Sequence, residues 1–117
     1  MKYVDQRDIA PLEFPGRSLT VLISPDDGSQ HLTVAISKVP AGGMLPWHMH
    51  ETSDEVIYVI EGEGTASHES LEEPVKVFPG MTFYMPMGKK HCIENKGRSE
   101  MRLCCAFSPA IKFAPPK

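Results

Sequence analysis

The sequence predicts an all-β fold in which two sheets form a barrel or sandwich. Many short segments are rich in β-branched and apolar residues, and turns that contain glycine or proline separate them at regular spacing. No segment has the periodicity of an amphipathic helix of ten residues or more. The length of 117 residues predicts one domain over residues 1–117, with an N-terminal arm at 1–16 and a C-terminal tail at 108–117.

The N-terminal part predicts an irregular arm followed by a β-hairpin. Prolines and a glycine interrupt residues 1–16, so we expect no regular element there. Residues 17–24 are β-branched and apolar, and residues 31–39 alternate between apolar and small or polar side chains. The Pro-Asp-Asp-Gly sequence at 25–28 is a strong turn signal between them. These segments are therefore expected to pair as antiparallel strands.

The segment at 55–61 is the most informative predicted strand. Ile57 and Val59 share one face, whereas Tyr58 and Ile60 share the other, because successive side chains alternate along a strand. Both faces are apolar, although a strand of an isolated antiparallel sheet would have one polar face. We therefore expect this strand to be covered on both sides, by a second sheet or by another subunit, and we predict a homodimer.

The C-terminal half adds a series of short strands. Residues 101–107 place Met101, Leu103, Cys105 and Phe107 on one face. The segment at 81–85 leaves two alternatives open, with either Met81, Phe83 and Met85 or Thr82 and Tyr84 facing inward. The tail from residue 108 contains three prolines and is expected to lie along the surface. The predicted strands are residues 65–68, 75–78, 81–85, 91–94 and 101–107.

Composition narrows the classes of partner and the compartment. The net charge of −3 argues against nucleic acid and anionic membranes as partners. No apolar run is long enough to span a membrane, and the N-terminal residues lack the apolar core of a signal peptide, so we expect a cytoplasmic protein. Cys92, Cys104 and Cys105 are odd in number and two are adjacent, which favours reduced or buried thiols over disulfides and leaves their role open.

Two histidines and a glutamate predict a metal site. His48 and His50 would lie on the same face of a strand, and a polar turn at 51–54 would let the chain return with Glu55 beside them. Imidazole and carboxylate ligands suit a divalent transition metal: iron, manganese, nickel, zinc or copper. Asp54 should point to the opposite face from Glu55. The alternative is that the two histidines are solvated loop residues, and the residues alone leave open which distant histidine completes the set.

Two motifs resemble those of the cupin superfamily, in its small single-domain form. The motifs are Gly42, His48, His50, Glu55 and Gly62, and then Gly80, Pro86, Gly88, His91 and Asn95. The resemblance implies a jelly-roll barrel, a double-stranded β-helix, with one metal ion held by His48, His50, Glu55 and His91. His31 and His68 are then not ligands. Many members have aspartate where this chain has Met81, a position that is not a ligand.

The resemblance allows several functions, because cupins include dioxygenases, decarboxylases, isomerases, lyases, polyketide cyclases and binding proteins. We expect a metal-dependent enzyme acting on a small molecule, and favour oxygenase chemistry over non-redox isomerase, cyclase or lyase chemistry. No catalytic residue is assigned. The alternative is a non-catalytic binding or sensor protein, and a purely structural metal is a third possibility.

The wall of the predicted cavity follows from strand parity. We expect Ile57, Val59 and Ile93 to line it, and Trp47 and Tyr58 to pack between the sheets or at a dimer contact. No inward cluster of arginines is evident, which argues against phosphorylated sugars as ligands.

Overall fold

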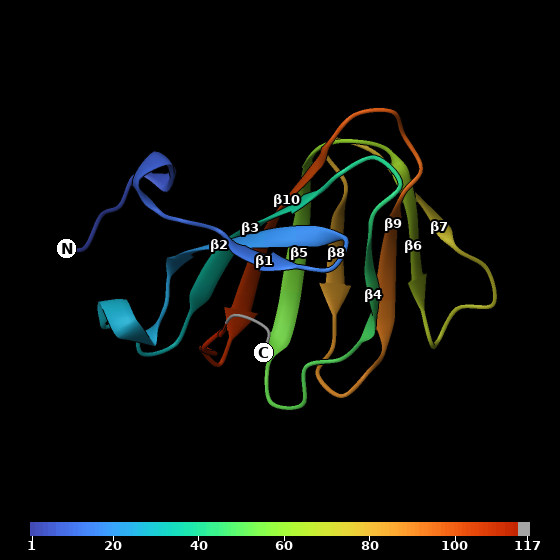
Figure 1. The fold of residues 1–117 in the computed structure, drawn as a ribbon. Coiled ribbons are helices and arrows are strands. Elements are labelled where there is room, and N and C mark those ends of the chain that lie inside the picture. The colour runs from blue at the N-terminus through green and yellow to red at the C-terminus, as the bar shows by residue number, and fades with distance from the viewer. Residues whose placement is uncertain (115–117) are drawn as a thin grey trace.

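The computed structural model describes residues 1–114, and its regular secondary structure is almost entirely antiparallel strands (Figure 1). One sheet has six strands in the order β1-β2-β3-β10-β5-β8, and the other has four in the order β4-β9-β6-β7. The predicted all-β jelly-roll barrel is confirmed. The six-stranded sheet contains β1 (Leu12–Phe14), β2 (Arg17–Ile23), β3 (Thr33–Val39), β5 (Asp54–Glu61), β8 (Thr82–Met85) and β10 (Met101–Ser108). The four-stranded sheet contains β4 (Met44–His48), β6 (Gly64–His68), β7 (Val75–Val77) and β9 (His91–Asn95).

The predicted hairpin forms between β2 and β3. Its connection begins with a short 3-10 helix, Pro25–Asp27, capped by Ser24, whose hydroxyl accepts from the Asp26 amide at 3.2 Å. Gly28 ends the turn in the left-handed conformation at φ +91°, which glycine adopts without steric cost. Within residues 1–114 the other helix is also a 3-10 turn, Gln6–Asp8.

The core lies between the two sheets and follows the predicted strand parity. All four residues of the predicted inward face of β10 are buried. The alternatives for β8 are also decided: Met85 is 4% exposed and Phe83 packs against the core, whereas Tyr84 is 61% exposed. Burial of these alternate side chains supplies most of the driving force for closing one sheet on the other.

Asn95, the last residue of the second motif, joins the two sheets. Its side-chain amide donates to the carbonyls of Val39 at 2.8 Å and Ser99 at 2.9 Å, and its oxygen accepts from the Gly97 amide at 2.9 Å. The side chain is buried and the Val39 bond runs from β9 to β3. The role of Asn95 is therefore structural, because each of its polar atoms has a partner.

The sequence predicts that both faces of β5 are covered, but no segment of the described chain covers the outer face. Val56 is 41% exposed, Tyr58 47% and Ile60 37%, whereas Ile57 and Val59 on the inner face are fully buried. The second sheet thus covers one side only. Trp47 is 52% exposed and does not pack between the sheets.

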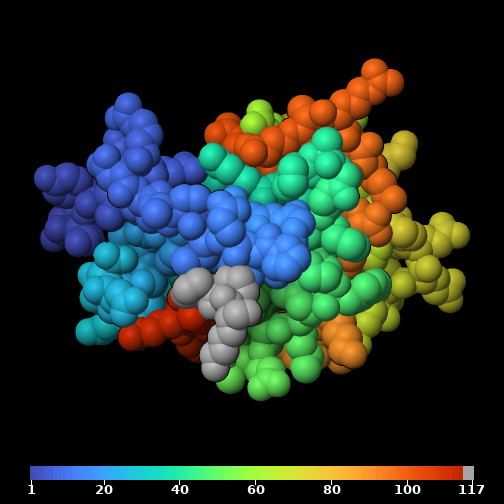
Figure 2. All heavy atoms as spheres, in the orientation of Figure 1, coloured from blue at the N-terminus to red at the C-terminus, as the bar shows by residue number. Residues whose placement is uncertain are grey.

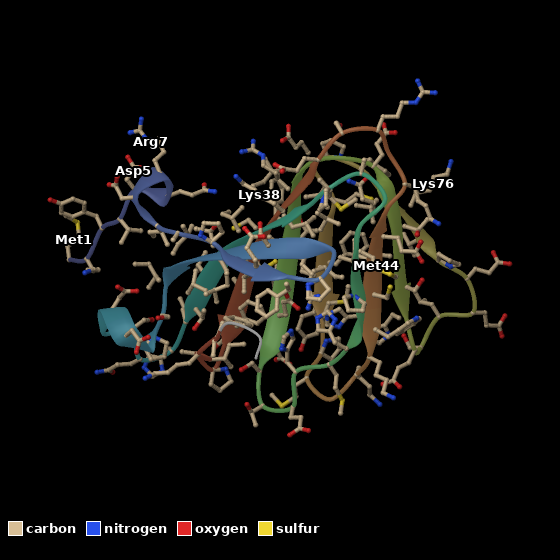
Figure 3. All side chains as sticks on the ribbon, viewed as in Figure 1. Met1, Asp5, Arg7, Lys38, Met44 and Lys76 are labelled. Carbon is tan, nitrogen blue, oxygen red and sulfur yellow. The ribbon has the colours of Figure 1, made fainter. Side chains whose placement is uncertain are left out.

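Both predicted terminal segments are more structured than expected. The arm contains β1, which pairs with β2 through Leu12–Leu19 and Phe14–Arg17. A strand of three residues between prolines is too short to show alternation, so the pattern missed it. The residues before it project from the body of the molecule, with Asp5 and Arg7 paired at 2.6 Å (Figures 2 and 3).

The tail was predicted to lie along the surface; none of its described residues is fully buried, but two of them pack against the core. The Ile111 carbonyl accepts from the Thr33 hydroxyl at 2.6 Å, and the Ile111 amide donates to the same oxygen at 2.9 Å. This pair of bonds directs the chain back towards the barrel, and Phe113 packs against the core. Residues 115–117 lie outside the described part. No helix within residues 1–114 is long and apolar enough to cross a membrane.

Candidate metal centre

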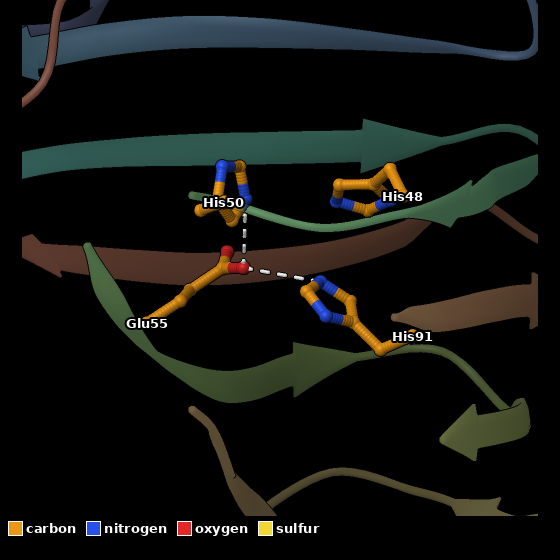
Figure 4. A group of neighbouring side chains, drawn as sticks. All are labelled: His48, His50, Glu55 and His91. Carbon is orange, nitrogen blue, oxygen red and sulfur yellow. Dashed lines mark ion pairs between the residues drawn. The ribbon is translucent and has the colours of Figure 1, made fainter. Parts of the chain in front are cut away.

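Four side chains from distant segments meet at one end of the barrel (Figure 4). His48 ends β4, His50 lies in the following loop, Glu55 lies in β5 and His91 begins β9. One nitrogen or oxygen atom from each lies within 4.8 Å of the others. The Glu55 Oε1 atom is 3.3 Å from His50 Nε2 and 3.3 Å from His91 Nε2. The structure thus brings together all four residues predicted as ligands.

A β-bulge turns His48 towards this group. Leu45 is opposite Ile93 in the β4–β9 pair, but His48, rather than Trp47, is opposite His91. One extra residue on β4 thus reverses the inward and outward positions. Pro46 lies in the bulge, where its missing N–H costs no ladder bond. The bulge places Trp47 outside and the imidazole of His48 inside.

The backbone also positions His50, which lies beyond the end of β4. Its carbonyl accepts from the Gly88 amide at 2.8 Å, which connects the two motif loops. The His48 and His50 rings lie 5.2 Å apart between centroids in an edge-on arrangement. The prediction that these two histidines point the same way is thus met, although a bulge and a loop bring them together rather than one regular strand.

The distances within the group fit a divalent ion. Nitrogen and oxygen ligands lie about 2.0–2.2 Å from zinc, so neighbouring ligand atoms are separated by roughly 3–4 Å. The observed 3.3 Å separations fall in that range. Both ring nitrogens of His91 are buried without a hydrogen-bond partner among the described residues. An ion would give its Nε2 atom the partner that the protein does not provide.

The protonation states also fit metal binding. His48 Nδ1 lies 2.6 Å from the Pro46 carbonyl; donation from this nitrogen leaves the Nε2 lone pair available to a metal. Burial, together with the nearby His91 and His50, lowers the pKa of His48 and favours its neutral form. Burial alone would raise the pKa of Glu55, but His50 and His91 outweigh this effect and lower the pKa to about 2. Neutral imidazoles and an ionised carboxylate are the forms that bind metals.

The remaining candidate residues lie elsewhere. Asp54 points away from Glu55, and its Oδ1 atom accepts from the Met87 amide at 2.9 Å. His31 is exposed. His68 is opposite His91 in the β6–β9 pair but lies outside the group, with Nδ1 2.7 Å from the Ser70 hydroxyl. As the resemblance implied, neither His31 nor His68 joins the four residues.

Three of the four candidate ligand residues, His48, His50 and Glu55, line a cavity of about 170 Å³. Its wall differs from the prediction, because Ile57, Val59 and Ile93 fill the core between the sheets instead of lining the cavity. Cys105 and Phe107 line it from β10, and five further lining residues come from segments that the sequence analysis did not connect with the site: Phe14, Arg17, Leu19, Ser37 and Phe113. The fourth candidate ligand residue, His91, does not line the cavity. Besides His48, His50 and Glu55, the lining residues are Phe14, Arg17, Leu19, Ser37, Leu45, Cys105, Phe107 and Phe113.

Comparisons with known proteins agree with this architecture. The sequence profile of the cupin domain matches residues 35–107. An uncharacterized protein of Methanocaldococcus jannaschii is 38% identical over 81 residues, which are 68% of this chain and 62% of that protein. The oxalate-binding protein of Thermotoga maritima is 31% identical over 64 residues, which are 55% of this chain and 51% of that protein.

A crystal structure described as a predicted oxalate decarboxylase from Thermotoga maritima superposes with a TM-score of 0.81 at 22% identity. The superposition covers 92% of this chain and 99% of that one. At this identity the likeness shows the fold alone. The chain spans 62% of the Methanocaldococcus jannaschii protein, 51% of the oxalate-binding protein and 41% of a germin-like protein of Arabidopsis thaliana.

Proposed function

Because the chain belongs to the cupin family, we propose that it is a metal-dependent enzyme acting on a small molecule. His48, His50, Glu55 and His91 would hold one divalent transition metal. The observation that carries this proposal is the convergence of their four ligand atoms within 4.8 Å of one another, beside a mostly apolar cavity of about 170 Å³. A closed structural site would have no need of such an opening.

The protein residues divide the work of the site. The histidines and Glu55 offer three ring nitrogens and one carboxylate as ligands, and the Pro46 carbonyl orients His48. Leu45, Phe107 and Phe113 line the wall beside them and exclude water from it. When bound, the ion supplies Lewis acidity and, if it is redox-active, electron transfer to oxygen.

The cavity favours oxygenase chemistry over non-redox isomerase, cyclase or lyase chemistry. Besides the metal-ligand residues, its titratable lining residues are Arg17 and Cys105. Burial raises the pKa of the Cys105 thiol well above its usual range, and the nearby Glu55 adds to this effect. Neither residue is a ready general base at neutral pH. Reactions that need a protein base are therefore less well served than those in which the ion supplies the reactivity.

The proposal is tested by metal content and turnover. Elemental analysis of protein purified without added metal should find one transition-metal ion per chain, and His50→Ala should lose it. Protein loaded with iron, manganese, nickel, copper or zinc is then assayed on enol, phenol and carbonyl substrates, with and without air. Unchanged metal content in His50→Ala would contradict the ligand assignment, and no turnover with any ion would contradict the enzyme.

A non-catalytic binding or sensor protein is the second candidate. The lack of a ready base in the cavity favours it as well. Binding of a small molecule that is released unchanged, with every metal and under both atmospheres, would select this alternative. A structural metal would instead be indicated if chelation unfolds the barrel.

We further propose a homodimer formed through the outer face of β5. Tyr58, Val56 and Ile60 form an apolar surface there. A contiguous exposed surface of large apolar side chains is typical of an interaction site. Sedimentation should give twice the chain mass of 13.0 kDa. Tyr58→Glu should convert the protein to a monomer, because a charge at the contact would be desolvated. A monomeric wild-type protein at micromolar concentration would refute the dimer.

The cytoplasmic location remains a proposal. All three cysteines are free in the structure, and Cys104 and Cys105 point to opposite faces of β10. Unpaired thiols suit a reducing compartment. Fractionation of cells with an antibody to the untagged protein would test it; recovery only from an extracellular or envelope fraction would contradict it.

A further inference from the structure

A positively charged side chain, that of Arg17, lies in the wall of the cavity beside the candidate metal ligands. Arg17 is the first residue of β2, and its guanidinium Cζ atom lies 4.9 Å from the centre of the Phe14 ring. Its Nη1 atom donates to the Pro15 carbonyl at 2.9 Å. No carboxylate of the described residues forms an ion pair with it, although a guanidinium has five N–H donors. Most of its hydrogen-bonding capacity is therefore unused by the described residues.

A buried hydroxyl group faces the same cavity. Ser37 is 1% exposed, and its Oγ atom has no hydrogen-bond partner among the described residues. A buried polar group without a partner costs free energy, and its presence calls for an explanation. Because Ser37 lines the cavity, a ligand group in the cavity could accept its hydrogen bond.

Strand pairing places these two donors on one wall. Ser37 on β3 is directly opposite Leu19 on β2, and Arg17 is two residues before Leu19 on the same face. Arg17 and Ser37 are thus diagonal neighbours, with backbones roughly 7–8 Å apart, a separation that a long side chain can span. Leu19 lies between them in the lining, and the ligands His48, His50 and Glu55 line the same cavity.

From this arrangement we propose that the cavity takes a small monocarboxylate with an apolar, single-ring or similarly sized body. The carboxylate binds the Arg17 guanidinium and the Ser37 hydroxyl, and the body lies between the phenylalanine side chains with its other end towards the metal ligands. This inference rests on the proposed function for the identity of the reacting end, but not for the carboxylate contact.

Size and charge select this ligand class. A cavity of about 150 Å³ accepts benzene in another protein, so about 170 Å³ suits one ring with a small substituent. Phe14, Phe107 and Phe113 supply apolar surface around it. A single guanidinium matches one negative charge in a planar carboxylate. A phosphate monoester carries about −1.5 to −2 at neutral pH and would keep an unmatched charge in an apolar wall.

The test measures binding of benzoate and of neutral benzamide by calorimetry, to metal-free and zinc-loaded protein. Wild-type protein should bind benzoate at least about tenfold more tightly than benzamide. Arg17→Gln should weaken benzoate binding about tenfold or more, since hydrogen bonds to charged groups are the stronger ones. Arg17→Lys should recover part of the affinity, because it keeps the charge but loses the planar fork. Arg98→Gln, an exposed position in a turn, is the matched control.

Ser37→Ala is a second variant that should fold normally, so its effect on binding cannot be attributed to misfolding. Its hydroxyl makes no bond within the described protein, so its removal should leave the thermal midpoint unchanged or raised and still weaken benzoate binding several-fold. Equal benzoate binding by wild type, Arg17→Gln and Ser37→Ala would overturn the proposal. So would the absence of benzoate binding, or tighter binding of phenyl phosphate with the same dependence on Arg17.

Metal content separates this proposal from the proposed function. Arg17→Gln should keep the metal content of the wild type, because Arg17 is not among the four ligand residues. If the wild-type protein holds no metal but binds benzoate through Arg17, the proposed function fails and the carboxylate contact stands. If the wild-type protein binds metal but benzoate binding does not depend on Arg17, the carboxylate contact fails and the proposed metal site stands.

Discussion

The two faces of β5, which pairs with β10, carry similar apolar side chains in opposite environments. On the inner face Ile57 and Cys105 are 0% and 2% exposed, whereas on the outer face Val56 and Tyr58 are 41% and 47% exposed. Only the inner face carries one of the four candidate ligand residues, Glu55. Apolar character therefore marks a strand residue as suited to burial, but the layer that covers it decides whether it is buried and which chemistry it meets.

Substitution of the neighbouring carboxylates Glu55 and Asp54 should give the largest difference between the two faces, measured as metal affinity. Glu55→Gln should reduce metal affinity by at least about 100-fold, since even residues behind the ligands typically contribute 10–100-fold. Asp54→Asn changes an outward carboxylate in the same way and should keep the metal. Elemental analysis after dialysis measures both. Equal loss in the two variants would mean that β5 does not distinguish its faces as described.

A pair of isoleucines separates the faces by stability. Ile57→Ala should lower the free energy of unfolding by about 2–5 kcal/mol, because it opens a cavity in the core. Ile60→Ala, at a position that is 37% exposed, should cost about 1 kcal/mol or less. Urea unfolding at low protein concentration measures both. A larger cost for Ile60 that grows with protein concentration would show that a second copy covers the outer face.

Alkylation of the adjacent cysteines should give a smaller difference, one of rate. Burial raises the pKa of both Cys104 and Cys105, with the larger effect at Cys105, which is 2% exposed. Because the thiolate is the reactive form, iodoacetamide should modify Cys104 first in the native protein. Peptide mass spectrometry over time distinguishes the two. Faster labelling of Cys105 would contradict the inward orientation of that side chain.

Local patterns were sufficient for most of the strand faces and for three of the four converging residues. Alternation along β10 identified its buried face, and the parity of β5 separated Glu55 from Asp54 correctly. The resemblance of the two motifs to those of cupins added His91 to the predicted ligands, although His91 lies 36 residues beyond Glu55 (91 − 55) in the sequence. These features depend on neighbours within a few residues, or on motifs with fixed spacing.

Other features had no local signal. The bulge at Pro46 changes which of Trp47 and His48 faces inward, and nothing in the alternating pattern marks an extra residue. Short β1 and the returning tail bring Phe14 and Phe113 to the cavity from both ends of the described chain. Arg17 and Ser37 likewise belong to strands that read as ordinary sheet, so no motif connected them with the site.

By itself, the amino-acid order determined the strands, their faces and the ligand types at one end of the barrel, because backbone sterics and side-chain alternation act over short distances. The tertiary structure alone decided which side chains surround the cavity, including the guanidinium of Arg17, which forms no ion pair within residues 1–114, and the hydroxyl of Ser37, which has no hydrogen-bond partner there. The physical reason is that a cavity is bounded by whichever segments curvature, bulges and chain ends bring together, and these contacts span the whole chain.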